Sequence, residues 1–244
     1  MKNVLLSLAF LCLTQLSMAQ KIYAWADVGL KAGYGLTGFL NTNLLDASDY
    51  DYQLATGNTF GGKVGLFFGL FNGITCDVLL SKSSQKLDYA INSRSFDHKI
   101  TWSNIDIDVL YRLQKDGVYI ELGPQISLLR KVTNADPNDP TRTDVKEYYN
   151  KKYYSGILGI GGYIFNYETF TTMLGFRLGY GLTDLINESG KAKGFPTPSQ
   201  VDLTKKASDK STNAAFVQLV IEANFALGYY GRSSCSKRAT LFNF

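Results

Sequence analysis

Charged side chains recur at alternate positions of otherwise apolar segments, and these are the residues of this chain best suited to chemistry. Because successive residues of an extended strand point to opposite faces, such charges share one face and the apolar residues share the other. Acidic and basic types are mixed, so that they can pair across neighbouring strands. The charged positions are Asp27, Lys31, Lys63, Asp77, Asp106, Asp108, Arg112, Glu121, Arg177 and Glu222.

Catalytic and metal-binding patterns are weak by comparison. His98 is the only histidine, and Asp97 and Ser95 are the nearby acidic and hydroxyl residues that could complete a hydrolase site. One histidine does not supply the ligand set of a metal centre, and the cysteines outside the first twenty residues, Cys76 and Cys235, lie far apart in the sequence. We therefore expect no catalytic residue, no metal site and no cofactor.

The segments that carry the charges alternate between apolar and polar residues, as transmembrane strands do. No Asp, Glu, Lys or Arg occurs on their apolar faces. A charge on the lipid face at mid-bilayer would cost about 2–4 kcal/mol. A soluble β-sandwich would show the same contrast, so alternation alone leaves both folds open. The eight segments are 23–37, 59–70, 74–81, 100–112, 120–128, 153–165, 170–180 and 215–227.

The connections between the segments alternate strictly between long and short. This alternation is typical of outer-membrane barrels, which have long outer loops and tight periplasmic turns. It favours an all-β fold, an eight-stranded antiparallel transmembrane β-barrel with both termini in the periplasm. Proteases acting on intact cells should then cut near Lys146 or Lys205 and spare 114–117. The connections are 38–58, 71–73, 87–97, 114–117, 130–152, 166–168 and 184–212.

Two strands carry irregularities. In the fourth segment the apolar residues are at even positions at Ile100 and Trp102 but at odd positions from Ile105 onward. Either a bulge lies near Ser103-Asn104, or the outer half of this strand rises above the lipid. Pro124 lacks the N–H that a paired strand needs, so a local irregularity is expected there too.

Eight strands enclose an interior that side chains about fill. The inward positions are rich in glycine, which leaves room for long charged side chains to cross the lumen. We expect Arg177 to reach acids such as Glu121 or Glu222. The six acids and four bases of the inward face can then form a lumen charge network, because buried charges need partners.

The two ends of the chain define its other regions. Lys2, an apolar run over 4–13 and the small residues around Ala19 form the three-part pattern of a secretory signal peptide, and that run is too short to span a bilayer as a helix. We predict a signal peptide at 1–19, the barrel at 20–230 and a basic periplasmic tail at 231–244. The last strand should end at Tyr229-Tyr230, which would make the tail dispensable for folding.

Four short motifs resemble the PorT-like outer-membrane β-barrel family: Asp106–Arg112, Tyr119–Gln125, Gly159–Gly162 and Gly179–Asp184. The resemblance covers nearly all of the mature chain, and it implies a signal-bearing porin-family barrel of this length. Some members of that family are linked to type IX secretion and gliding machinery, and most have no assigned function. The acids of the fourth strand and the basic tail depart from the family pattern.

These observations predict a non-enzymatic outer-membrane protein with a closed lumen. Its outer loops would contact a protein partner or assist a secretion apparatus. A small-solute or lipid-associated transporter is the alternative, and a barrel-embedded hydrolase is a third class. The expected partners are outer-membrane lipid and the barrel-assembly machinery. The net charge of +4 is too small and too dispersed for nucleic-acid binding.

Overall fold

The computed structural model describes residues 24–46, 50–53, 55–69, 71–91, 94–136, 139–167, 169–197 and 207–230. The predicted signal peptide at 1–19 and the predicted tail at 231–244 lie outside these ranges. Among the described residues, no helix is long and apolar enough to span a membrane.

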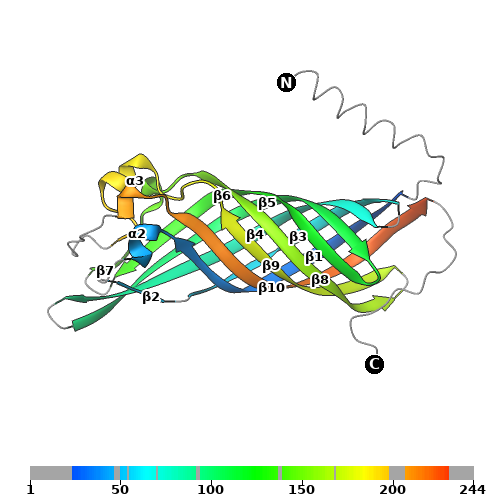
Figure 1. Ribbon diagram of the computed structural model, residues 1–244, viewed down its shortest axis with the longest axis horizontal. Helices are drawn as coiled ribbons and strands as arrows, with labels where there is room; N and C mark the ends of the chain where they lie inside the picture. The colour runs from blue at the N-terminus through cyan, green and yellow to red at the C-terminus, as the bar shows by residue number, and fades with distance from the viewer. Residues whose placement is uncertain are drawn as a thin grey trace, which may run out of the picture.

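Eight long strands form a closed antiparallel ring (Figure 1). Each strand pairs with its neighbours in the chain, and β1 closes the ring by pairing with both β3 and β10. The predicted eight-stranded antiparallel β-barrel is therefore confirmed. Its strands are β1 Ala24–Leu40, β3 Ala55–Phe68, β4 Asn72–Ile91, β5 Arg94–Lys115, β6 Val118–Asp136, β8 Lys152–Tyr167, β9 Phe170–Gly181 and β10 Asn213–Tyr230.

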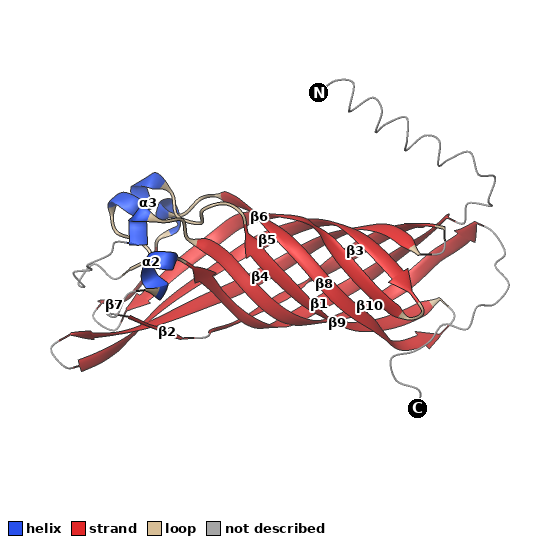
Figure 2. Ribbon diagram, viewed as in Figure 1, coloured by secondary structure: helices blue, strands red, loops and turns tan. Residues whose placement is uncertain are grey.

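The two ends of the barrel differ in the length of their connections. β1 begins and β10 ends at one end, where tight turns join β3 to β4, β5 to β6 and β8 to β9 (Figure 2). Asp116 and Gly117 both have positive φ, as the two-residue turn of a hairpin requires. The opposite end, the long-loop end, carries all the smaller elements (Figure 1). These are α2 Thr42–Leu45, β2 Tyr50–Gln53, β7 Asp139–Asp144, α3 Glu188–Ala192 and the 3-10 turns Lys146–Tyr148 and Ala207–Asp209.

The prediction of a long loop at 87–97 is wrong. β4 and β5 stay paired almost to their tips, where Ile91 lies opposite Arg94. Likewise, β6 continues to Asp136 through residues expected in a loop. The reason is tertiary: Leu87 and Tyr89 of β4 are buried, so the hairpin has an apolar inner face to pack beyond the predicted strand end.

The outer surface of the ring is apolar along the middle of the strands. Large side chains there are about half exposed, such as Phe60 and Leu122, at 57% and 60%. A continuous apolar surface of this kind is unfavourable in water and suits the hydrocarbon core of a bilayer. Members of this belt are Leu30, Leu36, Phe60, Val64, Leu66, Ile74, Val78, Leu80, Val109, Ile120, Leu122, Leu158, Ile160, Phe176, Leu178, Val217, Leu219 and Ile221.

Both expected irregularities are present. The β5–β6 register shifts between Ser103 and Asn104, because Arg130 of β6 is an extra residue at this point. The same ladder is interrupted opposite Gly123 and Pro124, where the proline cannot donate a backbone hydrogen bond. Residue burial along β5 nevertheless keeps one parity, with even positions inward from His98 to Arg112. The apolar residues change face because the interior of the barrel is apolar beside Ile100 and Trp102 and charged beside Asp106, Asp108 and Arg112.

Candidate functional site: the barrel interior

The structure places all ten residues of the predicted lumen charge network inside the barrel. None of them is more than 4% exposed. They come from seven strands of the ring: β1, β3, β4, β5, β6, β9 and β10. At this burial an ion is stable only beside an opposite charge or a hydrogen-bond partner.

Glu222 of β10 is the centre of one group of ion pairs. Its carboxylate accepts two hydrogen bonds from Arg112, at 2.7 and 2.9 Å. Lys31 lies 2.9 Å away on the neighbouring strand β1, directly opposite Glu222 in the register. Lys63 of β3 lies 3.1 Å from the other oxygen and also 3.4 Å from Asp27. One acid thus joins three bases from three different strands.

Arg177 of β9 is the centre of a second group. Its guanidinium lies 2.8 Å from Asp77 and 3.0 Å from Asp108, and its Nε lies 3.4 Å from Glu121. Of the two acids that the sequence suggested for Arg177, only Glu121 lies at ion-pair distance. Lys31 connects the two groups, because its Nζ lies 2.5 Å from Asp77 as well as near Glu222.

Inward glycines make room for two of the acids. A Cβ at Gly65 would lie 2.3 Å from the Asp27 carboxylate, and a Cβ at Gly159 would lie 2.6 Å from the side chain of Glu121. A side chain at either glycine position would force the neighbouring acid to move, so these glycines help to set where the two carboxylates lie.

The acids exceed the bases, six to four, and Asp106 is the acid set apart. It has no ion pair with any described residue. It lies toward the long-loop end beside a polar layer in which Asn104 donates hydrogen bonds to the hydroxyl oxygens of Tyr153 and Ser81, at 2.9 and 3.3 Å. A small cavity lined by these residues, Gln125 and Gln218 lies at this level.

The short-turn end of the interior is closed by aromatic and apolar side chains. Tyr119, Tyr163 and Met173 form a buried cluster. The guanidinium of Arg112 lies over the Tyr119 ring, 4.1 Å from its centroid, which links this cluster to the ion pairs. Gln114 donates a hydrogen bond to the Tyr163 hydroxyl.

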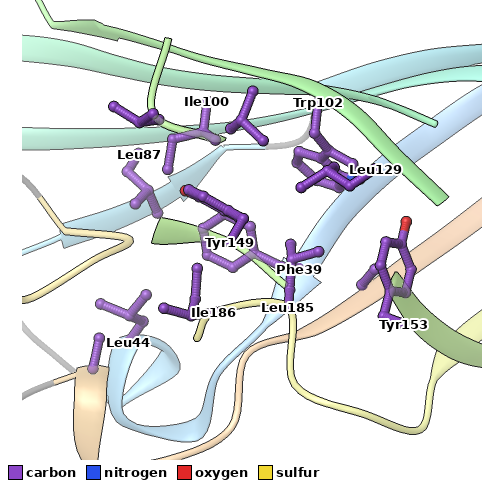
Figure 3. Packing of buried hydrophobic residues seen from close by; sticks show 14 of the residues in the cluster. Phe39, Leu44, Leu87, Ile100, Trp102, Leu129, Tyr149, Tyr153, Leu185 and Ile186 are labelled. Carbon is purple, nitrogen blue, oxygen red and sulfur yellow. The ribbon is translucent and has the colours of Figure 1, made fainter. Parts of the chain in front are cut away.

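The long-loop end is filled by a larger hydrophobic cluster, which we term the apolar plug (Figure 3). Strands and loops contribute to it together, and Trp102, Tyr149 and Leu185 are at most 1% exposed. The plug consists of Phe39, Leu44, Tyr50, Leu87, Tyr89, Ile100, Trp102, Leu129, Val132, Val145, Tyr149, Tyr153, Leu185, Ile186, Ala207 and Ala214.

Buried and half-buried polar side chains hold the loops onto the apolar plug. Asn41 caps α2 by accepting hydrogen bonds from two backbone amides, and its Nδ2 donates to Ala207 and Thr212 from a distant loop, at 2.9 and 3.0 Å. Asp184 accepts from the backbone N–H groups of Ile186 and Thr212, both at 3.0 Å. The long-loop end is therefore a packed platform joined by specific hydrogen bonds.

The three residues that could form a hydrolase site are not brought together. His98 is buried and faces inward, where its Nε2 is hydrogen-bonded to Asn134. Ser95 and Asp97 are exposed and lie at odd positions of β5, on the face opposite His98. Among the described residues, no group of three or more His, Cys, Asp or Glu side chains could hold a metal ion.

Sequence reasoning missed the apolar plug, although one signal of it was present. The change in parity at Ile100 and Trp102 marks the level at which the interior becomes apolar. Phe39, Tyr149 and Leu185 lay in segments assigned to loops, and no alternation of their own distinguished them from solvated loop residues.

No family model and no curated protein matches the sequence. Three solved structures are similar over most of their length. Ail, the attachment invasion locus protein of Yersinia pestis, shows 10% identity, a TM-score of 0.36 and coverage of 82% of this chain and 99% of that one. Neisserial surface protein A shows 11% identity and a TM-score of 0.38, with coverage of 83% of this chain and 96% of that one. OprG from Pseudomonas aeruginosa shows 8% identity and a TM-score of 0.40, with coverage of 84% of this chain and 95% of that one.

The class of protein follows from the chain's own geometry. A closed ring of eight antiparallel strands, an apolar belt outside and a charged interior define a small outer-membrane β-barrel. Lipid contacts the belt, and the lumen charge network is shielded from it by the ring of strands.

Proposed function

We propose that this protein is a closed, non-enzymatic outer-membrane barrel that acts through the platform at its long-loop end, in protein interaction or in support of a secretion apparatus. The observation that carries the proposal is the filled interior. A water-filled pore would expose its lining, whereas the ten charged side chains are at most 4% exposed and the apolar plug lies above them.

The construction of the platform supports a binding role. Leu44 of α2, Leu185 and Ile186 just before α3, and the segment around Tyr149 share one hydrophobic cluster, so these loop segments keep fixed positions relative to one another. Glu188 on α3 is 94% exposed and Lys151 is also exposed, and such side chains are available to a partner. A rigid surface loses little entropy on binding, which favours specific contacts.

The secretion role is the finer part of the proposal, and it rests on the PorT-like resemblance of the four short motifs. Three of these motifs line the lumen charge network or the strands around it, and the fourth ends at Asp184, which fixes the loop beneath α3. The resemblance therefore covers the barrel and one anchor of the platform.

Two measurements test the proposal. In planar bilayers of purified protein we expect no steady ion conductance above that of the lipid alone, and stable channels would contradict the closed lumen. In cells, replacing 188–193 by a glycine-serine segment of equal length should leave the barrel inserted and heat-modifiable. It should reproduce the secretion phenotype of a strain that lacks the protein. Normal secretion in the strain that carries the glycine-serine replacement would contradict the role of the platform.

One observation favours transport of an apolar solute as a second candidate. A groove of about 480 Å³ runs along the barrel wall toward the long-loop end, with lining from Leu36, Leu40, Leu178, Tyr180 and Val217 among other residues. Its lining is almost entirely apolar. Uptake of a fluorescent alkane analogue into liposomes that contain the protein, lost in Val217→Trp, would support this candidate over the closed binding platform.

The hydrolase remains the least supported class. Ser95 and Asp97 lie on the face of β5 opposite His98, and this separation supports the proposal of a non-enzymatic protein. A nucleophile and its base must lie within hydrogen-bond reach of each other.

A further inference from the structure

We propose that the outer wall of β4, β5 and β6 binds the phosphate groups of a lipid headgroup in the outer leaflet. The site is a lysine patch composed of Lys82, Lys99, Lys131, Thr101, Ser103 and Thr133. These residues line a polar groove of about 360 Å³ on the outside of the barrel, separate from the lumen and from the platform.

The strand registers place the patch residues in adjacent rows. Lys82, Ser103 and Lys131 lie directly opposite one another across β4, β5 and β6. In the next row Thr101 lies opposite Thr133. Three ammonium groups thus surround three hydroxyl groups on one face. The Thr133 hydroxyl donates to the Thr101 carbonyl and the Thr101 hydroxyl is hydrogen-bonded to Ser84, so the ammonium groups and the Ser103 hydroxyl are the donors open to a phosphate.

Within the part of the chain that the structure describes, the charges of the patch lack ion-pair partners. All three lysines are exposed, and none of them forms an ion pair with a described residue. Lys99 also lies directly opposite Lys86, and like charges in this position destabilise a sheet. Asp88 and Asp97, the next pair on the same face, offset part of this repulsion, and a bound anion would lower it further.

The height of the patch selects a lipid over a soluble anion. The outward positions of β4 are apolar up to Leu80, and Lys82 is the next outward residue. On β6 the last apolar outward residue is Leu128, just before the bulge that turns Lys131 outward. Two residues of strand span about 7 Å, so the patch begins where hydrocarbon gives way to headgroups. Because the long-loop end of such barrels is extracellular, this is the outer leaflet.

The test is a titration of purified, folded protein with bis-phosphorylated lipid A, followed by native mass spectrometry. Near a membrane surface each lysine contributes about five-fold to anionic lipid binding. The variant Lys82→Gln/Lys99→Gln/Lys131→Gln should therefore bind on the order of 100-fold more weakly. The matched control Lys146→Gln/Lys151→Gln/Lys210→Gln removes the same charge from the platform and should bind as the unchanged protein does.

Two further probes fix the chemistry and the source of the ligand. The same lipid without its phosphates should bind the unchanged protein as weakly as the patch variant binds lipid A. Inorganic phosphate should displace lipid A only at concentrations far above that of the lipid. An unaffected patch variant, an equal loss in the control, or equal binding of the dephosphorylated lipid would overturn the proposal. Displacement by equimolar phosphate would also overturn it, because the site would then be one for a free anion.

Discussion

The lumen charge network and the apolar plug occupy the same barrel, yet their chemistry is opposite. At the level of the network the outside of the strands is apolar and the inside is charged. At the level of the plug the inside is apolar and the outside carries lysines and hydroxyls. β5 shows the reversal on one strand, because Asp106, Asp108 and Arg112 face inward below and Ile100 and Trp102 face inward above.

The difference follows from the solvent at each level. In the bilayer, apolar side chains gain nothing by turning inward, since lipid already surrounds them. The interior can then hold ions, provided that they pair. Above the bilayer the barrel stands in water, and the hydrophobic effect again drives apolar residues inside. The lipid-embedded part of the barrel thus has its polar side chains inside and its apolar side chains outside, whereas the long-loop end has the apolar interior of a water-soluble protein.

The largest expected effect is the loss of the central acid of the network. Glu222→Gln leaves Lys31, Lys63 and Arg112 with too little negative charge, and breaking a buried ion pair costs about 3–5 kcal/mol. The urea midpoint of unfolding in detergent, followed by heat-modifiable mobility, should fall accordingly. Asp97→Asn, at an exposed position outside the network, is the control and should change little. Equal midpoints for the two variants would mean that the network does not stabilise the barrel.

Truncation within the apolar plug should cost somewhat less and act on a different part of the molecule. Leu185 is fully buried, and Leu185→Ala should destabilise its surroundings by about 2–5 kcal/mol. We expect faster proteolysis of the platform while the lipid-embedded strands stay protected and the urea midpoint of the barrel changes little. If the barrel midpoint fell as far as in Glu222→Gln, the plug and the network would be one cooperative unit.

Loss of the polar anchor of the platform should have a smaller effect. Asn41→Ala removes the cap of α2 and the three hydrogen bonds to the segment before β10, at a cost of about 1–2 kcal/mol. Hydrogen exchange should accelerate in peptides covering 41–46 and 207–212 and stay unchanged in β9. Thr42→Ala, at an exposed position of the same helix, serves as the comparison and should leave both peptides protected.

The smallest expected effect is a pH dependence of stability that is confined to the long-loop end. Burial lowers the pKa of His98, and the Asn134 hydrogen bond and the charge of Asp136 offset only part of this shift. A histidine whose folded-state pKa is depressed contributes stability above its unfolded pKa and loses it as the pH falls. The β4–β5 hairpin should therefore loosen below about pH 6.5.

The fluorescence of Trp102, measured in a Trp25→Phe background, reports on this loosening because Trp102 lies in the apolar plug, on the same inward face of β5 as His98. His98→Gln should flatten the pH response between pH 7 and pH 5. A response that persists in His98→Gln would assign it to another group.

The sequence by itself determined the ring. Alternating apolar and polar residues over segments of about ten residues predict eight strands, because a strand that crosses lipid must be apolar on its lipid-facing side. The alternation of long and short connections indicates that these strands are antiparallel members of a membrane barrel. The alternation of apolar and polar residues fixed which charges face inward, since the strand period of two leaves no freedom once the lipid face is known. Pro124 and the Ser103-Asn104 step also marked real irregularities, because each disturbs a ladder of backbone hydrogen bonds locally.

Tertiary structure alone decided which charges pair and where the strands end. Arg177 meets Asp77 and Asp108 rather than Glu222, because partners across a lumen depend on the shear of the barrel and on side-chain length, which no single segment encodes. β4 and β5 stay paired as far as Ile91 and Arg94 because Leu87 packs against residues from distant loops. Such burial arises only when segments far apart in sequence come together, so a local pattern could not reveal it.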